Sequence, residues 1–168
     1  MRIFRYFLLP LTVLAPLYAF ASAGSIDASH TYARICHDVS CTSYGTVNFA
    51  PTINVNTPGA TALVIDATVT GTAWGDEIGW INFTPTGGGV TLDTATGVLL
   101  GTAFANGGSW ITFNPSDVGG GTDVGVSINS DGEFEGWAWV SGLYGGWMHF
   151  DCADSATCVK TDWRPSAV

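Results

Sequence analysis

Two groups of acidic residues are the side chains of this sequence best suited to acid–base chemistry. Asp76 and Glu77 are adjacent, and Asp131, Glu133 and Glu135 alternate along a short stretch. Paired carboxylates hydrolyse glycosidic bonds when a cleft holds them about 5–9 Å apart. However, the first pair falls at an expected hairpin tip, and Asp131 precedes a glycine, as turn residues do. We therefore expect these carboxylates to serve turns, and we expect the protein not to be an enzyme.

The sequence gives weaker evidence for a catalytic nucleophile or a metal site than for acid–base chemistry. Nucleophile elbows, phosphate loops, dinucleotide fingerprints and zinc-protease motifs are absent from the sequence. The three histidines are scattered, and we expect His149, within a strand pattern, to be structural. We expect no cofactor, and calcium is the alternative, because two stretches place oxygen ligands in glycine-rich or turn-forming backbone. The weak calcium candidates are Asp123, Asn129 and Asp131.

The four cysteines form two close pairs, Cys36 with Cys41 and Cys152 with Cys158. An even count in an exported chain indicates disulfides. Short separation favours a bond within each pair, whereas cross-pairing would join the two flanks of the intervening segment. A four-thiolate zinc site is the third interpretation, but four and five intervening residues are loose spacings for zinc. We expect two disulfides, with local pairing favoured.

The aromatic side chains are the strongest candidates for a binding site. The chain has seven tryptophans, and six of them fall within one recurring motif. A polar residue follows each second-strand Trp two positions on, which a fully buried face would rarely show. We therefore expect a half-exposed row, which would stack on sugar rings or form the centre of a protein interface; the alternative is a second buried layer. The predicted face comprises Trp74, Trp80, Phe104, Trp110, Trp139 and Trp147.

The motif that carries these rings reads Gly, any residue, Ala, aromatic, a short loop, then Trp, an aliphatic residue, any residue, Phe. It occupies residues 71–83, 101–113 and 136–150, so successive copies start 30 and 35 residues apart. Such a period predicts one small β unit repeated along the chain. Each half alternates as a strand does, and a glycine-bearing loop joins the halves, so each copy is predicted to be an antiparallel hairpin.

The hairpin register follows if Trp74 lies opposite Trp80. Ala73 then opposes Ile81 and Gly71 opposes Phe83, and we expect the small residues to make room for the bulky ones. In all three copies the aliphatic residue and the Phe should share one buried face. The outer face should collect aromatic pairs across each hairpin.

The elements around the hairpins complete an all-β fold. Strand patterns at residues 90–93 and 126–129 turn each later copy into a three-stranded antiparallel meander. Residues 62–70 read as one continuous buried strand, and residues 46–55, interrupted by Pro51, as a pair of edge strands. The meanders would form a sandwich, a barrel or a short solenoid. The expected organisation is a signal peptide (1–23), an N-terminal segment with a Cys pair (24–61), a three-copy repeat domain (62–151) and a C-terminal Cys loop and tail (152–168).

Residues 71–85 carry a resemblance to a known group of sequences. They resemble a motif repeated in exported bacterial proteins, which commonly reads Gly-x-Ala-Trp, a few residues, then Gly-Trp-Ile-x-Phe. The second copy departs from it at Phe104 and Ser109, and the third by a longer loop and by Met148 and His149. The resemblance covers residues 62–151 and implies an extracellular bacterial β-repeat protein of uncharacterised function, with no catalytic residues.

The first 23 residues have the features of a secretory signal peptide. Arg2 and Arg5 precede an apolar stretch, and small residues follow it at a cleavage site. The apolar stretch is short and broken by prolines, so no membrane insertion of the mature chain is expected. Cleavage would leave three basic residues against fourteen acidic ones, a net charge near −11. Such a chain repels nucleic acid and anionic lipid.

These features favour a secreted or cell-surface structural or adhesive subunit that contacts copies of itself or other surface proteins and could assemble into a filament. A carbohydrate-binding module that uses the Trp row is the alternative, and a glycan-active enzyme is a third hypothesis. Residues 25–35 carry almost no strand-ending residue and lie outside the motif copies. We expect this stretch to add as a strand to a sheet edge, on a neighbouring chain.

Overall fold

The computed structural model describes residues 24–38, 40–41, 43–50, 63–65, 68–115, 125–142, 145–154 and 157–166, and these contain no α-helix. The predicted signal peptide and the calcium candidate Asp123 lie outside the described residues. The strands are β1 (Gly24–Cys36), β2 (Ser43–Asn48), β3 (Leu63–Ile65), β4 (Thr68–Thr70), β5 (Thr72–Gly75), β6 (Gly79–Asn82), β7 (Gly89–Leu92), β8 (Leu99–Ala105), β9 (Ser109–Thr112), β10 (Gly125–Ile128), β11 (Phe134–Val140), β12 (Gly146–Phe150) and β13 (Val159–Thr161).

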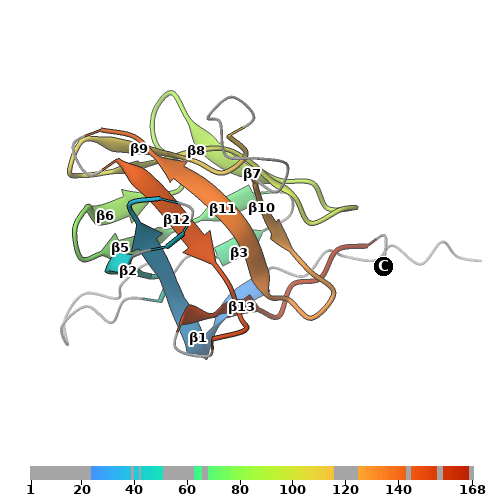
Figure 1. Ribbon diagram of the computed structural model, residues 1–168. Coiled ribbons are helices and arrows are strands. Elements are labelled where there is room, and N and C mark those ends of the chain that lie inside the picture. The colour runs from blue at the N-terminus through green and yellow to red at the C-terminus, as the bar shows by residue number, and fades with distance from the viewer. Residues whose placement is uncertain are drawn as a thin grey trace, which may run out of the picture.

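The strands close into one antiparallel barrel (Figure 1), so the all-β prediction is confirmed and the barrel is the form it takes. The barrel has eight long strands. Three of them are β1, β8 and β11. The other five are interrupted once, and each consists of two labelled strands that pair with the same neighbours: β2 with β3, β4 with β5, β6 with β7, β9 with β10, and β12 with β13.

Closure leaves every described strand paired on both sides. Two of these contacts are single bridges, Val98 with Ser127 beside β8 and Glu133 with Lys160 beside β11. The order of the long strands around the barrel follows the chain, and the last one, β12 with β13, returns to pair with β1. A barrel of this kind has no free sheet edge to offer another chain.

The expected hairpin register is present in all three motif copies. Trp74 pairs with Trp80, Phe104 with Trp110, and Trp139 with Trp147. The meanders β7–β8–β9 and β10–β11–β12 are present as well. The aliphatic and Phe positions of each copy all face the interior, where every one of them is about 1% exposed or less. These residues are Ile81, Phe83, Ile111, Phe113, Met148 and Phe150.

The centre of the barrel is a ring of four phenylalanines, one from each hairpin. Neighbouring ring centroids lie 5.7 Å apart for Phe49 and Phe83, and 6.0 Å apart for Phe83 and Phe113. The ring closes through Phe150, 6.4 Å from Phe113 and 5.5 Å from Phe49. Side chains therefore fill the interior as a packed core, which is what a barrel of eight strands has room for.

Phe49 belongs to a fourth hairpin that the sequence analysis did not identify. β1 and β2 pair so that Ala33 faces Val47, as Ala73 faces Ile81. The Phe49 amide donates to the Thr31 carbonyl at 2.7 Å, and the Phe113 amide donates to the Gly101 carbonyl at 3.0 Å in the same way. The barrel thus consists of four similar units, and the N-terminal segment supplies the first.

This placement corrects the expectation for residues 25–35. The stretch does form a strand, β1, but it pairs within its own chain, with β2 and β3 on one side and β12 and β13 on the other. The reason is visible in its burial: Ala33, Ile35 and Cys36 are fully buried. Their apolar side chains complete the core, and so the strand is a wall of the barrel rather than an added edge.

Two further strand predictions were wrong. Within the predicted strand 62–70, the described residues form two short strands, β3 and β4, that pair with each other. The N-terminal half of residues 46–55 belongs to β2, which lies between β1 and β5 and is therefore no edge strand. Residues 51–55 lie outside the described residues. A run of β-branched residues has no signal that separates one strand from two paired ones.

The recurring glycine before each Ala has a different cause from the one expected. Gly71, Gly101 and Gly136 all have positive φ, of 87°, 86° and 99°. A Cβ at Gly101 would lie 2.2 Å from the Gly89 carbonyl oxygen, and one at Gly136 would lie 1.9 Å from the Gly125 carbonyl oxygen. The glycines therefore permit a sharp bend where the neighbouring backbone approaches closely. Space for the Phe ring is not the deciding factor.

Both cysteine pairs form the predicted local disulfides, Cys36–Cys41 and Cys152–Cys158. The first joins the end of β1 to the loop before β2, and the second closes the loop between β12 and β13. Two disulfides fit an oxidising, extracytoplasmic compartment. Within the described part of the chain, no helix has the length and apolar character needed to cross a membrane.

Candidate functional site

The six predicted aromatic residues lie together on the outer surface, where we call them the aromatic belt: Trp74, Trp80, Phe104, Trp110, Trp139 and Trp147. They face outward because the neighbouring positions of each strand carry the core residues. Within each hairpin the two rings meet edge to face, with centroids 5.0, 5.0 and 5.1 Å apart. This geometry is the one that aromatic pairs prefer.

The belt is unevenly exposed. Trp74 is 38% exposed and Trp110 is 36% exposed, whereas Trp147 is only 6% exposed. Trp147 is covered because both Trp137 and Trp139 contact its ring edge to face. The belt is therefore open over the hairpins β5–β6 and β8–β9 and largely closed over β11–β12.

The fourth hairpin does not continue the belt. Arg34 and Thr46 pair at the position that two aromatic rings occupy in the other hairpins. The Arg34 guanidinium forms an ion pair with Asp154, and its other ladder neighbour is His149. The belt thus ends on one side at a charged residue.

An open cleft of about 530 Å³ lies beside the closed end of the belt, over β11, β12 and the start of the loop that follows β12. Its floor is the backbone around Gly136 and Phe150, which pair across the two strands. Trp137 and His149 form one wall, with ring centroids 3.7 Å apart and planes only 16° from parallel. Three carboxylates line the cleft together with Cys152 and Ala153, and we call this feature the acidic cleft. It is lined by Glu133, Glu135, Trp137, His149 and Asp151, among others.

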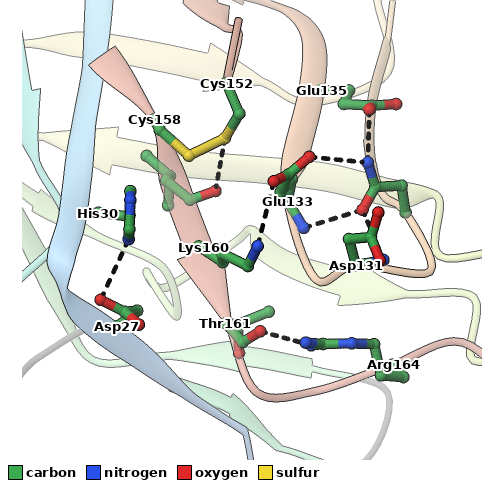
Figure 2. A network of polar contacts seen from close by, with 12 residues as sticks. Asp27, His30, Asp131, Glu133, Glu135, Cys152, Cys158, Lys160, Thr161 and Arg164 are labelled. Carbon is green, nitrogen blue, oxygen red and sulfur yellow. Dashed lines mark hydrogen bonds and ion pairs between the residues drawn. A yellow bond between two sulfur atoms is a disulfide. The ribbon is translucent and has the colours of Figure 1, made fainter. Parts of the chain in front are cut away.

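A hydrogen-bond network holds Glu133 and Glu135, two of the carboxylates that line the acidic cleft (Figure 2). Lys160 donates to Glu133 at 3.1 Å, and the Asn129 amide donates to Glu133 at 3.3 Å and to Glu135 at 2.5 Å. The hydrogen bond from Lys160, with a smaller contribution from Asn129, lowers the pKa of Glu133. The Glu133 charge is therefore balanced by Lys160, on the neighbouring strand.

His149 is kept uncharged by its surroundings. Partial burial lowers the pKa of His149 below its ordinary value of 6.5. Asp151 opposes this shift, and the positive charge of Arg34 adds to it. At neutral pH the ring is accordingly a flat, neutral surface against Trp137.

The other predicted acidic residues lie at turns. Asp76, at the tip of the β5–β6 hairpin, accepts a hydrogen bond from the hydroxyl of Thr46 on β2 at 2.7 Å, which joins this tip to the neighbouring strand. The Asn129 side-chain oxygen accepts from the backbone N–H groups of Asp131 and Glu133, at 2.9 and 3.0 Å, which shapes the turn between β10 and β11. The described residues contain no group of three or more His, Cys, Asp or Glu side chains placed to hold a metal ion.

Trp137, which lines the acidic cleft, is not among the residues predicted from the sequence. The signal was present: Trp137 lies two positions before Trp139, on the same face of one strand, and is directly opposite His149 in the expected register. Glu133 and Glu135 were noted only as a possible catalytic pair and were assigned to a turn.

No family model matches this chain, and no curated protein and no solved structure matches it either.

Proposed function

We propose that this protein is a non-enzymatic extracellular binding protein that holds polysaccharide on its aromatic belt. The observation that carries the proposal is the pair of exposed indoles, Trp74 at 38% and Trp110 at 36%, each braced edge to face by a second ring. An exposed, immobilised indole offers a flat apolar surface that loses little side-chain entropy when a sugar ring stacks on it.

Polar neighbours support the same ligand class. Asn82 and Asn106 are exposed next to the belt. The Asn106 backbone N–H donates to the Trp80 carbonyl at 2.8 Å, which holds this residue beside Trp80. Sugar hydroxyls need such donors and acceptors at the edge of a stacking surface. The disulfides support an extracellular setting for the interaction.

The test is a sedimentation assay with the mature protein and insoluble polysaccharides of neutral charge. Replacing Trp74 and Trp110 by Ala together should weaken binding by about tenfold or more, because each stacked ring contributes on the order of 1 kcal/mol. The matched control is Leu100→Ala, since Leu100 is 40% exposed but lies outside the belt. Retention by none of the polysaccharides, or equal losses in the control, would refute the proposal.

A structural or adhesive subunit is the second candidate, and the exposed apolar side chains favour it. Leu100, Trp74 and Trp110 would suit contacts with a second copy or with another surface protein. Such contacts would use side chains, because the closed barrel offers no unpaired edge for sheet extension. Light scattering at increasing protein concentration separates the two: a mass that rises, and that the Trp74→Ala/Trp110→Ala change returns to monomer, favours the subunit.

A further inference from the structure

We infer that the acidic cleft binds organic ammonium cations. This inference does not depend on the polysaccharide proposal, because the cleft uses Trp137 and His149, which are not part of the aromatic belt. It combines three features of one place: a hollow, an aromatic wall and negative charge that no basic side chain balances.

The unbalanced charge comes from Glu135 and Asp151. Gly136 and Phe150 form the last pair of the β11–β12 ladder, and Glu135 and Asp151 are the residues next to this pair, both lining the cleft. Asn129 donates to Glu135, and the Ala153 amide donates to Asp151 at 2.8 Å, but neither donor carries charge. Within the described residues, the ion pairs use Glu133, Asp154 and Asp27 and leave out these two carboxylates.

The aromatic wall determines the kind of cation. A bare metal ion needs several oxygen ligands at short range, whereas an alkylated or ring-borne ammonium gains from the face of an indole as well as from carboxylates. On β10, the residue opposite Trp137 is Gly125, which places no side chain over that flank of the indole. His149 stays neutral at pH 7 and therefore does not repel a cation.

The test compares matched charged and neutral ligands with the disulfide-bonded mature protein at constant ionic strength. Choline and 3,3-dimethylbutan-1-ol have the same shape and differ in charge; glucosamine and glucose make the same comparison on a sugar ring. For at least one pair, we expect the charged ligand to cause saturable shifts of the Trp137 indole and His149 ring NMR signals. The neutral ligand of that pair should cause none. A response to choline alone indicates a quaternary ammonium ligand, and a response to glucosamine indicates an amino sugar.

Variants assign the response to the cleft. The combined change Glu135→Gln and Asp151→Asn should weaken cation binding by about five- to tenfold, and Trp137→Tyr should weaken it less than Trp137→Ala, which should lose about threefold or more. Glu77→Gln is the control, an exposed carboxylate on another hairpin. The inference is overturned if charged and neutral ligands bind alike, if neither binds, if sodium competes as well as choline, or if the control loses as much.

The two functional proposals fail independently. Trp74→Ala with Trp110→Ala should abolish polysaccharide retention and leave choline binding unchanged. Glu135→Gln with Asp151→Asn should weaken choline binding and leave the retention of a neutral polysaccharide unchanged. Loss of both activities in both variants would show that neither site acts as described.

Discussion

Phe113 shows how much of the stability rests on single side chains. It is 1% exposed and lies between Phe83 and Phe150 in the ring at the centre of the barrel. Its neighbours come from two different hairpins, and so the cavity left by removing it could not collapse without moving strands that are paired on both sides.

We expect Phe113→Ala to lower the free energy of unfolding by about 3–5 kcal/mol, the usual cost of emptying a buried aromatic site. Urea denaturation followed by circular dichroism measures it. Phe104→Ala removes the same group from the half-exposed outer face and should cost clearly less. Equal costs at the two positions would contradict the inward and outward alternation of the strands.

His149 should make stability depend on pH below about 6.5. Its folded-state pKa is lowered, chiefly by burial, so between the two pKa values the unfolded chain binds the extra proton and acid favours unfolding. His149 therefore contributes stability that is complete above the unfolded pKa and is lost as the pH falls through the folded one. Asp151 and Arg34 modify the shift in opposite directions.

The expected result is a urea midpoint that falls between pH 7.5 and pH 5.5 in the wild type and falls less in His149→Gln. The variant also loses the stack on Trp137 at both pH values, so the comparison uses the change with pH rather than the absolute stability. The same fall in both proteins would show that other groups cause it.

At the scale of elements, Gly101 and Gly136 allow the strands to bend where neighbouring backbone approaches closely. Gly101 has a φ of 86° and Gly108 a φ of 88°. Because an L residue is strained at positive φ, an Ala at either position should cost a similar conformational energy of about 1–2 kcal/mol. Only Gly101 faces another chain segment, the Gly89 carbonyl, whereas nothing lies within 4 Å of a Cβ at Gly108.

Gly101→Ala should therefore destabilise the protein by at least about 1 kcal/mol more than Gly108→Ala. Thermal or urea unfolding of the two variants side by side gives the difference directly. If Gly108→Ala costs as much, the close approach between β7 and β8 contributes nothing and the backbone angle explains the glycine alone.

The hairpins were predictable from sequence because their signals are local. Alternation fixes which side chains face inward, and the loop length fixes the register, so Trp74–Trp80 and its two counterparts followed directly. The first hairpin was hidden because Thr31 stands where the others have glycine, and Arg34 where they have an aromatic ring. The pattern is preserved at Ala33 and at Val47, Asn48 and Phe49, which a proline follows two residues later.

The closure of the barrel was not predictable, because it depends on pairings between distant segments. No local feature of β1 indicates that β12 and β13 will lie beside it. The acidic cleft was predictable in part: the register of β11 against β12 places Trp137 opposite His149, but the ion pair between Glu133 and Lys160 of β13 joins distant segments. The belt could be predicted as a set of residues, but its uneven exposure could not, since Trp137 covers Trp147.

At the scale of the whole molecule, β1 is what closes the barrel. A chain that lacks residues 24–35 would leave β2, β3, β12 and β13 each without a neighbour and would expose the core around Val47 and Phe49. We expect this deletion to abolish cooperative unfolding and near-ultraviolet circular dichroism.

The matched control is the chain that starts at Gly24, which keeps β1 complete and should fold. Dispersed amide signals in a proton–nitrogen NMR spectrum report folding in both chains. A truncated protein that remains folded and dispersed would mean that the remaining strands close without β1, and the described topology would then be wrong.

The pairing of β1 with the last strands also constrains how the protein reaches its native state. The Ser25 amide donates to the Asp162 carboxylate, 137 positions away. β2 and β3 follow β1 along the chain and can pair with it early, but its other neighbours, β12 and β13, lie near the far end of the chain. Contacts this distant in sequence make folding slow, on the order of milliseconds to seconds for all-β domains. Until the last strands pair, β1 keeps one edge without a neighbour, and this edge is where aggregation can begin.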